Sequence, residues 1–261
     1  MKTFTAKDIR VAPIKAKDAS AIVKKIHYSG KVVLGSQLHF GVFLDGKLEG
    51  AMQFGPSLDK RNTQRLVDGT GWNDFIELNR MAFSDRLPRN SESRAIGIAM
   101  RLLKKHYPNL EWVISFSDGT QCGDGTIYRA SGFVLTAIKK NKTIWEFPDG
   151  ERVSDLSIKQ AQDWQKKKFG KVVLGTEALR LAKNMGAKPL AGFQLRYVYF
   201  LNQEAKSRLT CPIIPFSKIA EVGASMYLGK SIQRPKQAEP GPPGMRRGST
   251  DPDAPITQEA V

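Results

Sequence analysis

The chain has 261 residues, with 41 Lys and Arg against 25 Asp and Glu, which gives a formal net charge of +16. Its 41% hydrophobic and 9% aromatic residues can form a sizeable core, which excludes a largely disordered chain. No apolar run approaches the roughly 18 residues of a membrane span, and residues 1–25 lack the apolar core of a signal peptide. We therefore expect a soluble intracellular protein without membrane contact, whose charge favours a polyanionic partner such as nucleic acid.

The N-terminal region combines a short strand with an amphipathic helix. Residues 8–14 favour a strand, and Asp18 is a candidate cap for a helix that ends near Ile26. The spacing of Ala21, Ile22 and Ile26 predicts that this side of the helix faces the core.

Residues 37–84 are expected to form three strands. The first two, 37–44 and 48–54, are separated by Asp45-Gly46-Lys47, in which Asp-Gly is typical of a hairpin turn. Residues 75–84 alternate between apolar and polar side chains, which indicates a third strand.

The second half of the chain begins with a strongly amphipathic helix. This helix starts at Asn90, Ser91 or Ser93 and ends before Pro108. Its apolar face consists of Ile96, Met100 and Leu103. A central strand (110–116), a Gly-rich loop, a short helix (126–131), a strand from Phe133 and a late strand (193–201) follow. The fold class predicted is α/β, with a central mixed sheet flanked by helices.

We expect a single domain over residues 1–229, a basic and mostly helical insertion at 148–190, and a disordered tail at 230–261. The tail is rich in proline and poor in large apolar side chains, so burial cannot offset the entropy of ordering it. It has five basic and four acidic residues, so a charge of +15 belongs to residues 1–229.

Two short motifs carry candidate chemistry. The first turn of the helix after residue 90 offers unpaired amides to an anion, and Arg94-x-x-Gly97-x-Ala99 within it resembles the pyrophosphate-binding signature of the GNAT acyltransferase superfamily. Further along, Tyr128-x-x-x-Gly132-Phe133 resembles a GNAT element whose tyrosine protonates the departing thiolate of coenzyme A. Each motif alone also suits a capped amphipathic helix or a core aromatic residue.

More specific segments resemble the Mom family of bacteriophage DNA-modification proteins. They are Ile26-His27-Tyr28-Ser29-Gly30, Phe40-Gly41-Val42-Phe43, Leu78-Asn79-Arg80-Met81-Ala82, Asn90-Ser91-Glu92-Ser93-Arg94 and the run from Ser117 to Tyr128. The resemblance implies a GNAT-like transferase that converts adenine in double-stranded phage DNA to N6-carbamoylmethyladenine and protects it from host restriction endonucleases. It also implies action in the cytoplasm of the host bacterial cell.

The resemblance also implies a set of site residues. His27, Tyr28, Asp118 and Tyr128 are the candidate catalytic residues, and the same four offer nitrogen and oxygen ligands to a possible non-haem iron. The candidate binding residues for an acyl-CoA-type donor, such as acetyl-CoA, are Arg94, Ala95, Gly97 and Ala99. From the residues alone, His27 also suits a helix C-terminus and Asp118 a simple turn.

A flipped adenine needs aromatic walls, for which Phe40, Trp72, Phe116 and Tyr28 are candidates. Arg80 has even prospects of facing the cleft or the outside, and Cys122 lacks a histidine at a spacing that indicates a dyad. Two other functions stay open: N-acetyl transfer to a protein or small amine, and non-catalytic DNA binding by a basic protein.

Overall fold

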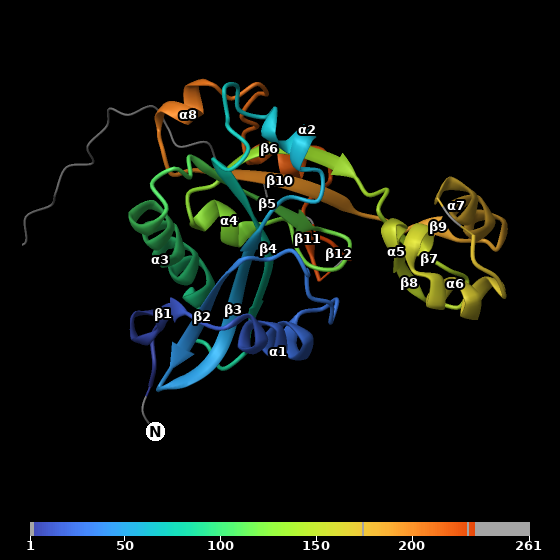
Figure 1. Ribbon diagram of the computed structural model, residues 1–261, viewed down its shortest axis with the longest axis horizontal. Coiled ribbons are helices and arrows are strands. Elements are labelled where there is room, and N and C mark those ends of the chain that lie inside the picture. The colour runs from blue at the N-terminus through green and yellow to red at the C-terminus, as the bar shows by residue number, and fades with distance from the viewer. Residues whose placement is uncertain (1–2, 174, 229, 233–261) are drawn as a thin grey trace, which may run out of the picture.

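The computed structural model describes residues 3–173, 175–228 and 230–232. Its centre is a seven-stranded mixed sheet in the order β1-β2-β3-β4-β5-β10-β6 (Figure 1). The strands are β1 (Arg10–Pro13), β2 (Leu38–Leu44), β3 (Lys47–Gly55), β4 (Phe75–Phe83), β5 (Trp112–Asp118), β6 (Val134–Lys140) and β10 (Phe193–Phe200). Only the β4–β5 pair within this sheet is parallel. The predicted α/β fold class, with a central mixed sheet flanked by helices, is confirmed.

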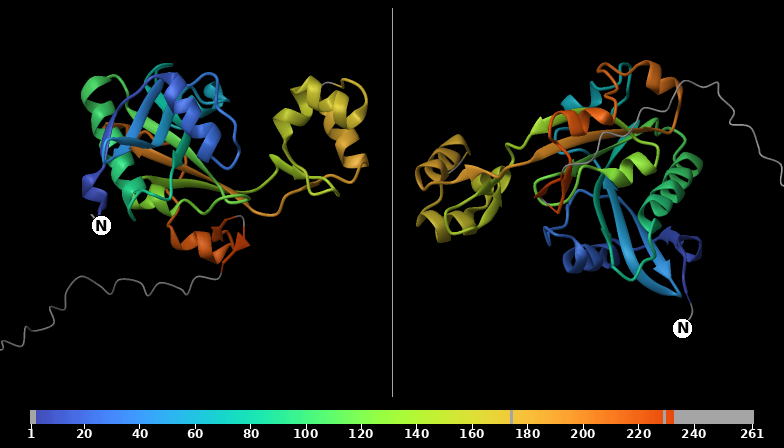
Figure 2. Two further views of the ribbon diagram at one scale, coloured as in Figure 1. Left: turned by 90° about the horizontal axis from the view of Figure 1, so that it is seen from below. Right: turned by 180° about the vertical axis from the view of Figure 1, so that it is seen from behind.

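Helices cover both faces of this sheet (Figure 2). They are the 3-10 helix Ala6–Asp8, α1 (Ala16–Ile26), α2 (Lys60–Gln64), α3 (Ser91–His106), α4 (Thr126–Ala130), α8 (Glu204–Ser207) and α9 (Ser217–Glu221). α1 lies on one face, against β3 and β4, while α3 and α4 lie on the other. In the described part of the chain, no helix has the length and apolar character needed to cross a bilayer.

The hairpin between β2 and β3 is formed as predicted. Leu44 pairs with Lys47, and the two turn residues Asp45 and Gly46 have φ values of 50° and 75°. Two successive left-handed residues define the tight turn that Asp-Gly favours, because neither side chain there obstructs a positive φ strongly. Lys47 belongs to the strand rather than to the turn.

The predicted core face of α1 is correct for Ile22 and Ile26, which are half-buried, and wrong for Ala21, which is exposed. The fully buried residues of this helix are Ala19 and Val23. Asp18 lies in the first turn, and the N-cap residue Lys15 makes no side-chain capping bond. Ala19, Ile22, Val23 and Ile26 lie at positions i, i+3, i+4 and i+7 and so share the covered side of the helix, which Ala21 does not.

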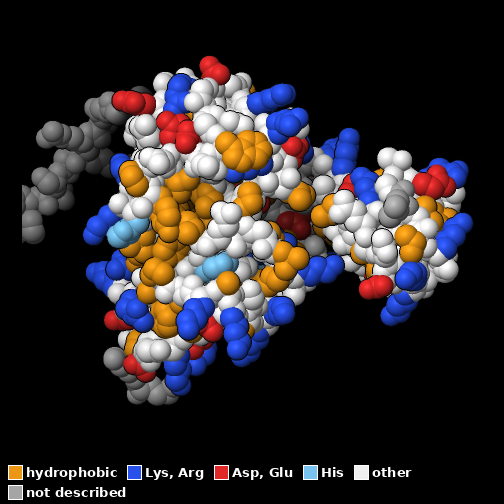
Figure 3. Space-filling view, viewed as in Figure 1, with side chains coloured by type: hydrophobic (Ala, Val, Ile, Leu, Met, Phe, Trp, Pro, Cys, Tyr) orange, Lys and Arg blue, Asp and Glu red, His pale blue; other side chains and the backbone are white. Residues whose placement is uncertain are grey.

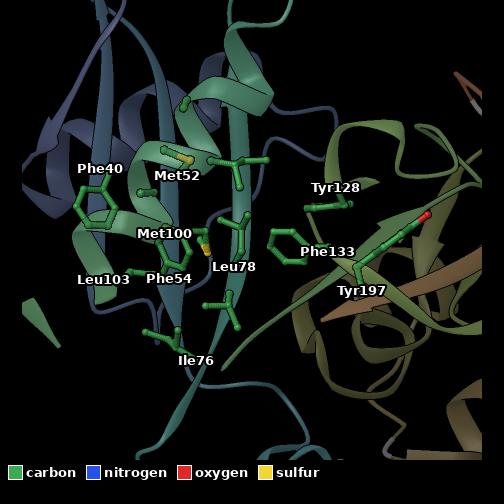
Figure 4. Packing of buried hydrophobic residues seen from close by; sticks show 14 of the residues in the cluster. Phe40, Met52, Phe54, Ile76, Leu78, Met100, Leu103, Tyr128, Phe133 and Tyr197 are labelled. Carbon is green, nitrogen blue, oxygen red and sulfur yellow. The ribbon is translucent and has the colours of Figure 1, made fainter. Parts of the chain in front are cut away.

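The main core lies between the sheet and the helices α3 and α4 (Figure 4). The predicted face of α3 is confirmed, since Ile96, Met100 and Leu103 are all fully buried there. Phe40 also belongs to this core and meets Phe54 edge to face, with ring centroids 5.8 Å apart. It is therefore a packing residue and not an exposed aromatic wall.

The two parallel strands at the centre of the sheet separate toward their carboxyl ends. Their register runs over three pairs, from Phe75↔Trp112 to Glu77↔Ile114, and both strands continue well beyond it. Past these pairs the facing edges diverge, and a cavity opens between them. This separation makes room for a ligand within an otherwise continuous sheet.

The segment between β6 and β10 forms a separate lobe (Figures 1 and 2). It contains a second sheet of β7 (Ile144–Glu146), β8 (Arg152–Ser154) and β9 (Lys188–Pro189), with α5 (Asp155–Gln160), α6 (Gln162–Phe169) and α7 (Gly175–Asn184). Trp145 and Phe147 belong to the lobe's own apolar core. The lobe therefore begins before residue 148, which corrects the predicted start of the insertion. Helices make up most of residues 148–190, and a small sheet accompanies them.

A short hairpin follows α9, formed by β11 (Met226–Tyr227) and β12 (Lys230–Ser231). The predicted tail at 230–261 thus starts inside a strand pair, because Lys230 bonds with Tyr227 across the hairpin. The remainder of the predicted tail, 233–261, lies outside the described residues.

Candidate functional site

The cavity between β4 and β5 has a volume of about 720 Å³. Its walls come from the end of α1, from residues 78–83 of β4, from the end of β5, from the 122–128 segment and from the C-terminal hairpin. His27, Tyr28, Asp118 and Tyr128 all line it. The space-filling view shows a hollow with acidic side chains at its depth, between the main body and the lobe (Figure 3).

The cavity passes through the sheet. Successive residues of a strand face opposite sides, so Ser115 and Ser117 lie on one face of β5 and Phe116 and Asp118 on the other. Ser115 contacts Tyr128 on the face of α4, and Asp118 contacts Tyr28 at the end of α1. Two reactants can therefore enter from opposite faces and meet where the strands separate.

Tyr28 and Asp118, which are 90 positions apart in the chain, form a direct hydrogen bond. The Tyr28 hydroxyl donates to Oδ2 of Asp118 at 3.2 Å. Because burial is the largest effect and the Asp118 carboxylate adds to it, the pKa of Tyr28 lies far above its usual value. The phenol stays protonated at neutral pH, and its oxygen can still accept a bond from a ligand.

The carboxylate of Asp118 is held by several donors. Oδ1 accepts Nε2 of Gln194 at 2.7 Å, the backbone amide of Thr120 at 3.0 Å and the Thr120 hydroxyl, while Gln121 reaches Oδ2 at 3.4 Å. Gln194 and Asp118 are opposite each other in the β10–β5 register. The carboxylate is thereby fixed in one orientation beneath Tyr28.

His27 follows α1 directly and lies beside Tyr28, with ring centroids 4.3 Å apart. Burial, and then the nearby Arg80, lower the pKa of His27 to about 4, while Asp118 acts in the opposite sense. The ring is neutral at pH 7. The amide of Ser29 donates to Nδ1 at 3.2 Å, which leaves the ring proton on Nε2. His27 in this form is a hydrogen-bond donor at Nε2.

Tyr128 is buried beneath the other face of the sheet. Its ring lies against Tyr197 and Phe133, with centroids 5.2 and 5.3 Å away. Burial raises the pKa of Tyr128 to about 12, although the bond to Ser115 acts in the opposite sense. The hydroxyls of Ser115 and Tyr128 are 2.9 Å apart, and Ser115 also lies 3.2 Å from the carbonyl oxygen of Leu78. The hydroxyl of Tyr128 is therefore protonated at neutral pH and lies beside the cavity.

A glycine fixes the start of the helix that carries Tyr128. Gly125 has a φ of 80°, and a Cβ atom there would come within 2.4 Å of the Tyr197 ring. Only glycine allows both the left-handed backbone and this close approach. The Tyr197 hydroxyl also donates to the carbonyl oxygen of Asp124, so the loop before α4 is held from below.

The structure shows which of the other candidate residues, Arg80, the aromatic residues and Cys122, lie at the cavity. Arg80 faces the cavity, where it donates to the carbonyl oxygens of Lys31 (3.1 Å) and Asn79 (2.8 Å). Phe116 also lines the cavity, whereas Trp72 lies elsewhere, under the ammonium group of Lys60. Burial and then Asp118 raise the pKa of Cys122 to about 12, so its thiol is not an activated nucleophile.

The proposed donor-binding residues on α3 have different surroundings. Ala95 and Ala99 are fully buried in the main core, which makes them packing residues in this structure. Gly97 is half-buried and Arg94 is exposed. Glu92 is the residue of this helix that lines the cavity, and its carboxylate is unfavourable to a phosphate at the same place.

The four proposed ligands do not fit an iron site. Tyr28 bonds to Asp118, but Tyr128 bonds to Ser115 and Nδ1 of His27 lies 2.8 Å from the Ser29 hydroxyl. Within residues 3–173, 175–228 and 230–232, no group of three or more His, Cys, Asp and Glu side chains is placed to hold a metal ion. The predicted iron site is therefore not supported.

Sequence patterns gave no indication of two parts of this site. Gln194 belongs to a strand whose alternation identifies the strand but not its register, so its bond to Asp118 depends on the β5–β10 pairing. The hairpin residues Met226, Tyr227 and Leu228 line the cavity although no motif marks them.

The strand order, the separation of β4 from β5 and the cavity define an α/β protein with a ligand cavity at the centre of a mixed sheet. The model of the Mom protein family matches residues 8–218. The methylcarbamoylase mom of Escherichia phage Mu is 36% identical over 208 residues, which are 79% of this chain and 81% of that protein. The chain therefore belongs to the Mom protein family.

Solved structures with some likeness include two acetyltransferases. The ribosomal-protein-S18-alanine N-acetyltransferase from Escherichia coli is 11% identical with a TM-score of 0.41, over 75% of this chain and 95% of that one. The IAA acetyltransferase from Bacillus cereus is 9% identical with a TM-score of 0.40, over 74% of this chain and 99% of that one.

Proposed function

We propose that this protein is a transferase that converts adenine in double-stranded phage DNA to N6-carbamoylmethyladenine and so hides restriction sites from host endonucleases. The observation that carries the proposal is the 36% identity to the phage Mu methylcarbamoylase over 208 residues. The net charge of +16 supports a polyanionic substrate. We place its action in the cytoplasm of the infected bacterium.

The product requires a new bond between adenine N6 and the methylene carbon of a carbamoylmethyl group. That carbon gives up its bond to a leaving group, N6 loses one proton, and the leaving group gains one. Tyr128 suits the last step, since burial keeps its hydroxyl protonated at neutral pH. It would act from the α4 face of the cavity.

The Tyr28–Asp118 pair suits the removal of the N6 proton. Tyr28 donates its own proton to the carboxylate, so its oxygen can accept the hydrogen bond of the exocyclic amine. As N6 forms its new bond, its proton passes to Tyr28 while the phenolic proton passes to Asp118. The adenine must leave the base stack to reach this point, and the ring of Phe116 offers it an aromatic wall.

An acyl-CoA-type donor is part of the proposal. Transfer of an acetyl group from a thioester would form an amide at N6. A carbamoylmethyl group is joined through its methylene carbon instead. The reaction therefore requires either a donor whose leaving group is on that carbon or a step in addition to acyl transfer.

The test is a mass analysis of nucleosides from the DNA of cells that express the protein. Wild-type protein is expected to yield N6-carbamoylmethyladenine. Tyr128→Phe is expected to lower the yield about 100-fold or more, because it removes the proton donor. Tyr107→Phe is the matched control, since Tyr107 is exposed at the end of α3 and loses the same hydroxyl.

Unmodified adenine in cells that supply the donor would overturn the proposal and favour N-acetyl transfer to another amine. Unmodified adenine together with tight DNA binding would favour a non-catalytic DNA-binding protein, provided that Tyr128→Phe binds DNA as tightly as the wild type.

A further inference from the structure

Two groups of exposed lysines lie on opposite sides of the cavity. The arm cluster consists of Lys139, Lys140 and Lys142, at the end of β6 where the chain enters the lobe. The α1 cluster consists of Lys24, Lys25 and Lys31, around the end of α1. In the described part of the chain, none of these six ammonium groups forms a salt bridge.

The strand register fixes the arm cluster relative to the site. Gln194 pairs with Asp118 on one side and with Lys139 on the other. Side chains of directly paired residues share one face of a sheet, so Lys139 lies on the same face as Asp118. Two strand spacings separate them, which is about 10 Å.

The α1 cluster is tied to the opposite side of the same opening. Lys24 and Lys25 form the last turn of α1, directly before the cavity-lining His27. The carbonyl oxygen of Lys31 accepts a bond of 3.1 Å from Nε of Arg80, which itself lines the cavity. Lys139 and the α1 cluster therefore flank the face on which Tyr28 and Asp118 lie, while Lys140, the next residue of β6, points to the other side of the sheet.

The lobe makes this face concave, and Lys and Arg side chains lie above and below the hollow between it and the main body (Figure 3). Four cations of the lobe, Arg152, Lys159, Lys168 and Arg180, bond to carboxylates within the lobe. The lysines of the arm cluster form no such salt bridge within the described residues, so no carboxylate of the chain competes with an external anion for them.

On the basis of the proposed function, we propose that the arm cluster and the α1 cluster together form a two-sided phosphate clamp for duplex DNA across the cavity. A nucleotide that rotates out of a duplex pivots about its own backbone, so the phosphates on both of its sides remain at the mouth of the pocket. Each cluster holds the backbone on one side. Such contacts fix the position of the duplex without reading its sequence.

The test measures the affinity of the full chain for a short adenine-containing duplex at several salt concentrations. One variant replaces the arm cluster (Lys139→Gln, Lys140→Gln, Lys142→Gln) and a second replaces the α1 cluster (Lys24→Gln, Lys25→Gln, Lys31→Gln). The control, Lys104→Gln with Lys105→Gln and Lys206→Gln, removes the same charge from exposed positions on α3 and α8.

Each lost phosphate contact lowers the slope of log affinity against log salt by about 0.9, so each cluster variant is expected to lose about 2 to 3 in slope. The control is expected to keep the wild-type slope, and a Lys→Arg version of each cluster to restore it. Thermal unfolding of each variant checks that it is folded.

A slope unchanged in either cluster variant, or lowered equally in the control, overturns the clamp. Nucleoside analysis separates this from failure of the proposed function. If the wild type makes modified adenine but the cluster variants keep the wild-type salt slope of DNA binding, the clamp is rejected and the proposed function stands. Unmodified adenine in the wild-type sample removes the proposed function.

Discussion

At the scale of single residues, the site depends on polar groups that hold one another. Tyr28 donates to Asp118, Asp118 is fixed by Gln194 and Thr120, and Tyr128 meets Ser115 on the other face. Both tyrosine hydroxyls are protonated at neutral pH, as phenols ordinarily are, and the surroundings of each raise its pKa further. The site thus offers two phenols with different partners rather than a single activated nucleophile.

Asp118→Asn tests the anchor of Tyr28. The substitution keeps the shape of the side chain but removes its negative charge, so the proton of Tyr28 loses its acceptor. Adenine modification is expected to fall about 100-fold or more, because a charged acceptor for the relayed proton is lost. Quantitative nucleoside analysis measures the effect. Asp163→Asn, an exposed position in the lobe, is the control, and equal activity of the two variants would contradict the role of Asp118.

His27 predicts how stability depends on pH. Its pKa is about 4 in the folded chain because of burial and Arg80, against 6.5 for the ordinary side chain. Between these values the unfolded chain binds more protons at this residue, so the stability from neutral His27 is complete above pH 6.5 and lost as the pH falls toward 4. The difference in thermal midpoint between wild type and His27→Gln is expected to change over this range. A difference in thermal midpoint that stays constant from pH 4 to 7.5 would contradict a lowered pKa of His27 in the folded chain.

At the scale of elements, the sheet and its insertions have separate cores. The main body buries Ile96, Phe54 and Tyr197, while the lobe buries Trp145 and Ile158. β6 and β10 connect the two parts, and Phe193 pairs with Lys140 where the lobe begins. A lobe with its own core can vary in size or charge without disturbing the cavity in the main sheet.

Asn141 is the polar contact that closes the neck of the lobe. Its Nδ2 donates to the carbonyl oxygens of Ile144 (2.9 Å) and Leu190 (2.8 Å), and its Oδ1 accepts the amide of Thr143 at 2.9 Å. Asn141→Ala leaves these buried groups without partners and is expected to lower the free energy of unfolding by about 1–3 kcal/mol. Denaturant unfolding measures this free energy. Asn184→Ala, at the exposed end of α7, is the control and should change the free energy of unfolding by less than about 0.5 kcal/mol.

At the scale of the whole molecule, the positive charge is concentrated outside the C-terminal segment. Residues 233–261 contain four basic and four acidic residues, so they contribute no net charge. The entire excess of +16 therefore belongs to residues 1–232. Electrostatic attraction to a polyanion depends on this part of the chain.

Truncation after Ile232 tests this distribution of charge. Removal of residues 233–261 is expected to leave the salt dependence of duplex binding within about 0.5 slope units of the full chain, because no net charge is lost. The measurement is fluorescence anisotropy at several salt concentrations. A slope that falls by one unit or more would show that the segment neutralises phosphates.

Much of the fold follows from local sequence patterns. The hairpin at Asp45-Gly46, the buried face of α3 and the apolar strand β5 all formed where alternation or turn chemistry predicted them. Patterns were inexact at Ala21 of α1, which is exposed, and at the start of the lobe, whose core begins with Trp145. No local pattern states which strand lies beside which.

The sequence by itself determined the α/β class, the excess of positive charge, and His27, Tyr28, Asp118 and Tyr128 as candidates. Only the tertiary structure decided that these four residues line one cavity, that Arg80 faces it, and that Gln194 holds Asp118. The physical reason is that strand register and the separation of β4 from β5 depend on contacts between residues far apart in the chain. The same register gives Lys139 its position beside the cavity.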